Sequence, residues 1–164
     1  MSRKRRSYES GHKAKYLVVV DDSVECDRAI YYASRRAARN NASVIMLRVI
    51  ETKDRHQQWL GVADIMRAEA HEEANAALDR AAGRANGVAG ITAERAIREG
   101  ELAQAILNLI EEDEDIISLI LAANSGEGGP GPLVAGLNKN IGQYPVPVGI
   151  VPGNLTDDEL DALS

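Results

Sequence analysis

The sequence has 164 residues, of which 45% are hydrophobic, a single cysteine and a formal net charge of −6 at pH 7. This length suits one domain with its own core, and no apolar run approaches the ~20 residues that a membrane-spanning helix needs. Because Cys26 is the single cysteine of the sequence, an internal disulfide framework and a cysteine-rich metal cluster are excluded. No secretory signal segment is recognisable, so we expect a reducing, cytoplasmic setting.

The charge is distributed unevenly along the chain. Residues 1–15 contain six Lys or Arg and one Glu, a net charge of +5 that leaves −11 for the rest. An acidic body argues against binding DNA or RNA, because nucleic-acid binding needs a basic face that neutralises phosphates. We expect residues 1–15 to form a basic, flexible N-terminal tail and residues 154–164 to form an acidic C-terminal tail. The domain then spans residues 16–153.

The first predicted strand is Tyr16–Val20 (YLVVV), a continuous apolar run of the kind found in strands buried on both faces. Residues 21–23 (DDS) predict a turn, with Ser23 as the N-cap of the helix that follows. In that helix, small or apolar residues recur at helical spacing from Cys26 to Ala37. Cys26 therefore faces inward, and we interpret it as an inert buried thiol.

The middle of the chain alternates between apolar strands and an alanine-rich helix. It predicts a strand at Ala42–Ile50 and then a polar connection at 51–58, after which Trp59 is a packing residue. A helix follows at Val62–Asn86 and ends at Gly87 or Gly90. Next come an edge strand at Ile91–Ile97 and a helix whose buried positions are Leu102, Ile106, Leu109 and Ile110.

Residues 111–115 (EEDED) favour a solvated turn over a cation site, because calcium loops space their ligands and place glycine at the bend. After them the sequence predicts a strand at Ile116–Ala122, a glycine loop, a short helix at Leu133–Gly142 and an edge strand at Val146–Val151, which lies beside Pro145 and Pro147. This alternation implies an α/β fold with a parallel sheet that helices cover on both faces.

The glycine loop contains GxGxxG, formed by Gly126, Gly128 and Gly131. A dinucleotide fingerprint also needs an acidic residue ~20 positions later, where this chain has Ile150 and Val151. The Gly-Lys-Ser/Thr ending of a P-loop is absent as well. Backbone amides around residues 125–129 nevertheless suit an anion.

In order and spacing, the segments YLVVVDDS, VIMLRVIE, LILAANSGEGGPGPLVAG and PVPVGIVP resemble the universal stress protein family. The resemblance covers about Tyr16–Gly153. It implies an open five-stranded parallel sheet of order 3-2-1-4-5 of the Rossmann-like, adenine-nucleotide-binding type. Ligands of such sheets bind beyond the carboxyl ends of the strands that flank the switch point, here strands one and four.

Nucleotide-binding members of this family carry Gly-x-x-Gly, nine residues, then Gly-Ser/Thr, with an aspartate after the first strand and an aliphatic residue late in the second. The resemblance therefore implies a nucleotide site made of Asp21, Val49, Ser125, Gly126, Gly128, Gly129 and Gly136. Two positions depart from the pattern: Ala123 replaces the first glycine, and Leu137 replaces the hydroxyl residue. Leu137 fits an apolar helix stripe instead.

The leading interpretation is a non-catalytic, homodimeric stress-response protein that pairs through its last strand and binds ATP or AMP, with Mg²⁺ as the counter-ion of the phosphates. The alternative is a nucleotide-independent family member that acts through regulatory protein partners. A weak nucleotide hydrolase is the third reading. It lacks an identifiable general base beside Asp21 and Asp22; His12 lies in the tail, and His56 and His71 have no metal-ligand spacing. We expect no structural metal and no membrane or nucleic-acid partner.

Overall fold

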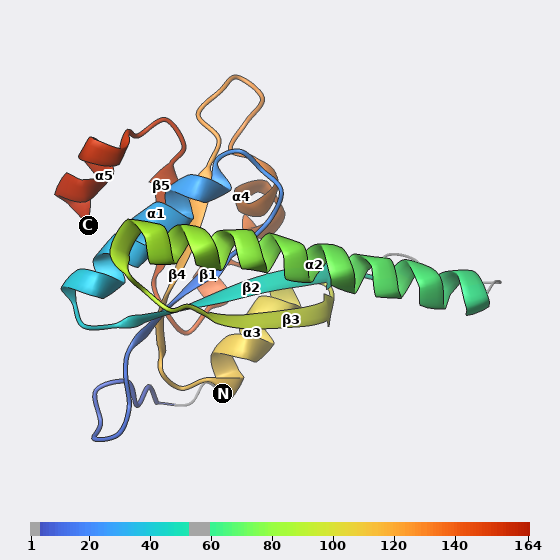
Figure 1. Ribbon diagram of the computed structural model, residues 1–164, viewed down its shortest axis with the longest axis horizontal. Helices are drawn as coiled ribbons and strands as arrows, with labels where there is room; N and C mark the ends of the chain where they lie inside the picture. Colours follow the sequence, from blue (N-terminus) through green and yellow to red (C-terminus); the bar gives the residue numbers. More distant parts are fainter. Residues whose placement is uncertain (1–3, 53–59) are drawn as a thin grey trace.

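In the computed structural model, which describes residues 4–52 and 60–164, a twisted sheet lies between two layers of helices (Figure 1). The strands are β1 Lys15–Val19, β2 Ser43–Glu51, β3 Glu94–Gly100, β4 Ile116–Ala123 and β5 Val148–Pro152. The helices are α1 Cys26–Arg39, α2 Leu60–Ala89, α3 Leu102–Glu112, α4 Pro132–Leu137 and α5 Asp157–Leu163, with a 3-10 turn at Ile141–Gln143.

The five strands pair in parallel in the order β3-β2-β1-β4-β5, which confirms the predicted topology. Successive residues of a strand point to opposite faces, so the apolar run of β1 contributes to two cores. Val18 packs with α1 and α2 on one face, and Leu17 packs with α3 and α4 on the other. Because helices bury both faces of the sheet, β1, β2 and β4 are apolar along most of their length.

Several local predictions are wrong. β3 begins at Glu94, three residues after the predicted start, because its register is set by pairing with β2 from Ile45↔Glu94 onward. The predicted helix Leu133–Gly142 stops at Leu137, where a segment rich in Asn and Gly disfavours helix. The N-cap of α1 is Glu25, not Ser23.

Other local predictions are confirmed. α2 ends at Ala89 and is followed by Gly90 with φ +66°. Cys26 is 5% exposed, and burial raises the pKa of its thiol to about 12.

Most of the predicted connection 51–58, with His56, and Trp59 lie outside the described residues. Within the described ranges, no helix combines the length and apolar character that a bilayer span requires.

The N-terminal segment packs against the end of α3, which differs from the flexible tail that the sequence predicts. The Nη1 of Arg5 donates to Ile110 O at 2.8 Å and to Asp113 O at 3.0 Å, so its guanidinium caps the last carbonyls of α3. His12 Nδ1 lies 2.7 Å from Asp115 Oδ1. The acidic turn 111–115 therefore holds this basic segment in place.

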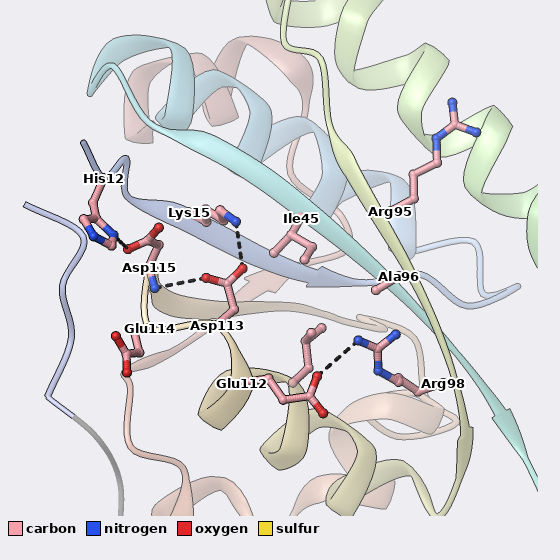
Figure 2. Close-up of a pocket in the computed structure, with 11 residues that line it drawn as sticks. His12, Lys15, Ile45, Arg95, Ala96, Arg98, Glu112, Asp113, Glu114 and Asp115 are labelled. Atoms are coloured by element: carbon pink, nitrogen blue, oxygen red, sulfur yellow. Dashed lines mark hydrogen bonds and ion pairs between the residues drawn. The ribbon is translucent and has the colours of Figure 1, made fainter.

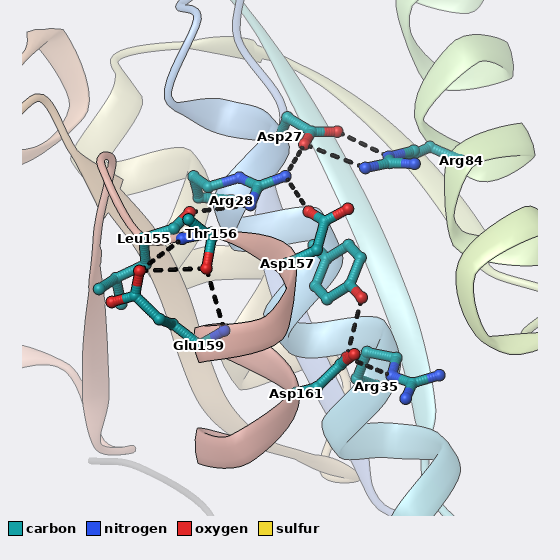
Figure 3. Close-up of polar contacts among 10 residues, drawn as sticks. Asp27, Arg28, Arg35, Arg84, Leu155, Thr156, Asp157, Glu159 and Asp161 are labelled. Atoms are coloured by element: carbon teal, nitrogen blue, oxygen red, sulfur yellow. Dashed lines mark hydrogen bonds and ion pairs between the residues drawn. The ribbon is translucent and has the colours of Figure 1, made fainter.

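The C-terminal residues also differ from the expected tail, because they form α5 and pack on α1 (Figure 3). Thr156 and Glu159 make a capping box at its start, and Leu160 is fully buried. Arg28 Nη2 lies 2.9 Å from Asp157 Oδ1, and the hydroxyl of Tyr31 donates to Asp161 at 2.8 Å. The acidic residues of this end thus pair with α1 instead of facing only water.

Candidate functional site

The turn after β1 is built around the side chain of Asp21. Its Oδ1 accepts hydrogen bonds from the backbone N–H of Ser23 at 3.1 Å and from the hydroxyl of Ser23 at 2.5 Å. This Asx turn ends β1 and directs the chain into α1. It also fixes the Asp21 carboxylate at the carboxyl end of the sheet, where ligands of open parallel sheets bind.

A cavity of about 600 Å³ lies beside this turn, between the ends of β1 and β2 and the starts of α3 and α4. Asp21 and Val49 both line it, so the structure brings these two predicted site residues together. Leu102, Pro132 and Leu133 supply the apolar side of the cavity. Its size falls within the usual range of small-ligand pockets, ~300–1,000 Å³.

Arg48 also lines this cavity, and the sequence analysis missed it. Its Nη2 donates to Asp22 Oδ2 at 3.0 Å, and its Nη1 donates to Val20 O at 3.2 Å. The hydrogen bond from Arg48 lowers the pKa of the Asp22 carboxyl. A single arginine in the apolar run of β2 was the available sequence signal, because a charge in a buried strand needs a partner.

The glycine loop extends away from the body of the molecule between β4 and α4 (Figure 1). Its two ends are joined by a hydrogen bond from Asn124 N to Pro130 O at 2.9 Å, and the N–H of Gly126 donates to the side chain of Asn124 at 2.7 Å. Ser125, Gly126, Gly128 and Gly129 are exposed, and none of them is among the described residues that line the 600 Å³ cavity.

The predicted convergence of the aspartate turn and the glycine loop on one crevice is therefore only partial. The cavity is reached by Pro132 and Leu133, which follow the loop, rather than by the loop glycines. Gly136 lies exposed within α4, where a Cβ would be 3.7 Å from Leu102 Cδ2. Leu137 is fully buried beside Leu133, which confirms the apolar stripe.

Glu25 is the second site residue that the sequence analysis missed. It is 6% exposed and lies under the base of the glycine loop, where its Oε1 accepts a hydrogen bond from Asn124 Nδ2 at 3.3 Å. A Cβ on Gly131 would overlap Glu25 Oε2, and a Cβ on Gly153 would lie 3.0 Å from Glu25 Cβ. The Glu25 side chain thus fills the space that two glycines leave, with its carboxylate beside Gly131 and its Cβ beside Gly153.

A second cavity, of about 580 Å³, lies at the amino ends of the strands (Figure 2). Its charges are arranged in pairs: Lys15 Nζ lies 2.7 Å from Asp113 Oδ2, and Arg98 Nη2 lies 3.2 Å from Glu112 Oε2. The described residues contain no group of three His, Cys, Asp or Glu placed to hold a metal ion.

Comparisons with known proteins agree with this fold. The model of the universal stress protein family matches residues 14–152. The universal stress protein UspA from Lactobacillus plantarum is 20% identical, with a TM-score of 0.67 over 85% of this chain and 97% of that one. No curated protein matches the sequence.

Two further structures are described as complexes with adenine nucleotides. The universal stress protein from Archaeoglobus fulgidus in complex with dAMP is 17% identical, with a TM-score of 0.62 over 85% of this chain and 98% of that one. A universal stress protein in complex with cAMP is 20% identical, with a TM-score of 0.61 over 87% and 98%. At these identities the likeness establishes the fold alone.

Proposed function

Since this chain belongs to the universal stress protein family, we propose that it is a non-catalytic binding protein whose 600 Å³ cavity takes the adenosine part of an adenine nucleotide. The observation that carries this proposal is the presence of Asp21 and Val49 in the wall of one cavity. Two structural relatives bound to dAMP and cAMP support the ligand class.

The chemistry of the cavity fits a nucleoside. Val49, Leu102 and Leu133 offer an apolar surface for a base, and Asp21 offers a fixed carboxylate to which a ribose hydroxyl or an exocyclic amine donates. Ser23 already donates two hydrogen bonds to Asp21 Oδ1, so the orientation of the carboxylate is fixed before a ligand binds. A hydrogen bond to such a charged acceptor is worth about 1.5–3 kcal/mol, or roughly 10- to 150-fold in affinity.

The experiment combines mass spectrometry of small molecules released from the freshly purified protein with calorimetric titration of adenosine, AMP and ATP, with and without Mg²⁺. Asp21→Asn keeps an oxygen for the Ser23 N–H but removes the charge, and we expect it to weaken adenosine binding tenfold or more. Asp158→Asn is the matched control, because it removes the same charge at an exposed position of α5 that does not line the cavity. An empty extract together with no binding of any of the three ligands would refute the proposal.

The second candidate is a nucleotide-independent protein that acts through protein partners. It is favoured by the closed glycine loop, whose Gly126 N–H is bound to Asn124, and by the burial of Leu137 at the position of the family's hydroxyl residue. The same titrations decide between the two functions, since this candidate predicts no binding of adenosine, AMP or ATP, with or without Mg²⁺.

We further propose that two copies pair through β5. This strand lies at the edge of the sheet, and Ile150 on it is 42% exposed. Sedimentation velocity at micromolar concentration should show a dimer, and Ile150→Lys should shift it to the monomer. A wild-type monomer at that concentration would end this proposal.

A further inference from the structure

The Glu25 carboxylate lies at the base of the glycine loop, beside Gly131 and Asn124. It contacts Gly131, which directly precedes Pro132 in the cavity wall, and it accepts a hydrogen bond from Asn124, which begins the loop. A ligand that reached from Asp21 and Val49 toward the loop would therefore approach this carboxylate. Glu25 is 6% exposed, so water screens its charge poorly.

The packing around Glu25 indicates that the loop is shaped for this side chain. Gly131 has φ +90°, and any Cβ there would collide with Glu25 Oε2. Gly153 lies on the other side, where a Cβ would be 2.6 Å from Ala123 O and 3.0 Å from Glu25 Cβ. Gly131 and the Asn124 amide thus contact a carboxylate that the chain itself provides, and Gly153 packs against the Cβ of the same side chain.

The charges of the cavity act in the same direction. Its lining includes the carboxylates of Asp21, Asp22 and Glu51 and one guanidinium, that of Arg48, which is paired with Asp22. Among the described residues, the lining therefore carries a formal charge of −2 before Glu25 is counted. A like charge within a few ångströms of a buried carboxylate is disfavoured, and the cost grows with each phosphate added to a ligand.

We propose that Glu25 is a specificity-determining residue, an internal anion that keeps phosphate groups away from the base of the glycine loop, so that the cavity prefers adenosine to AMP and AMP to ATP. This proposal rests on the proposed function for its adenosine part. The exclusion of phosphate from the loop rests on Glu25, Gly131 and Asn124 alone, and it is testable without adenosine.

The test compares the wild type with Glu25→Gln and Glu25→Ala. Gln keeps the shape and still accepts the hydrogen bond from Asn124, whereas Ala vacates the space. Glu127→Gln is the matched control, because Glu127 is exposed in the same loop and the substitution removes the same charge. Adenosine, AMP and ATP are titrated by calorimetry in EDTA at fixed ionic strength, and inorganic tripolyphosphate is added separately in a thermal-shift assay.

In the wild type we expect the Kd for ATP to exceed the Kd for adenosine. Glu25→Gln should lower the ratio of these two constants tenfold or more, and Glu127→Gln should leave it within about threefold. Tripolyphosphate should stabilise Glu25→Gln and Glu25→Ala but neither the wild type nor Glu127→Gln. A wild type that prefers ATP, or an equal change in the two Gln variants, would overturn the proposal.

Failure of the adenosine site is distinguishable from failure of this proposal. If no form of the protein binds adenosine, the proposed function is wrong, and the tripolyphosphate result alone decides the role of Glu25. Stabilisation confined to the two Glu25 variants would support the internal anion. No stabilisation of these variants would refute it.

Discussion

Restoring the family's hydroxyl residue at position 137 should damage the fold rather than create a phosphate site. Leu137 is fully buried in the core formed by α3, α4 and one face of the sheet. Leu137→Ser therefore removes a buried apolar side chain and places a hydroxyl in an apolar environment. We expect no gain in affinity for ATP.

The magnitude follows from two costs. Truncating a buried leucine costs about 2–5 kcal/mol, and burying a hydroxyl without a partner adds about 1–3 kcal/mol. We therefore expect the free energy of unfolding to fall by roughly 3–8 kcal/mol, which is about 6–30 °C in melting temperature for a domain of this size. Ala135→Ser is the control, because Ala135 is exposed on the same helix and should change stability by less than about 0.5 kcal/mol.

Urea denaturation followed by circular dichroism measures the effect, and titration with ATP is run on the same samples. A Leu137→Ser protein within about 1 kcal/mol of the wild type would show that this position is not packed as described. A tenfold gain in ATP affinity would refute the reading that α4 turns this side chain into the core.

Three other outcomes are expected. Arg5→Ala should lower the free energy of unfolding in urea by about 1–3 kcal/mol, since its guanidinium caps the last carbonyls of α3, whereas Lys4→Ala, an exposed neighbour, should have little effect. Although burial alone would raise the pKa of Asp27, hydrogen bonds from Arg84 and a second arginine lower it. Asp27 therefore contributes stability above its unfolded pKa, about 3.9, and this contribution disappears as pH falls through the lower folded value. The stability difference between wild type and Arg84→Ala should accordingly shrink below about pH 4 in urea titrations. Because burial raises the pKa of the Cys26 thiol to about 12, a thiol reagent at pH 8 should label Cys26 only after denaturant is added, and rapid labelling of the native protein would contradict this.

The sheet was predictable because its signals are local and repeated. Each inner strand is a continuous apolar run, and the alternation with helices leaves few topologies. The start of β3 was not predictable, since only pairing with β2 decides that Glu94 rather than Ile91 opens the strand. The two chain ends were misjudged for a related reason. Charge at a terminus predicts solvent, but Arg5 and Asp157 find partners on α3 and α1 that are distant in sequence.

The candidate site shows why a glycine pattern does not identify its ligand. The family resemblance pointed to Asp21 and Val49, and both line one cavity because both lie at strand ends in a parallel sheet. The need for glycine at 131 arises instead from Glu25, which is more than a hundred residues earlier and carries no motif. A glycine records only that something approaches the backbone closely. In this chain the close neighbour of Gly131 is a carboxylate of the protein itself, so the same pattern that suggests phosphate binding argues for its exclusion.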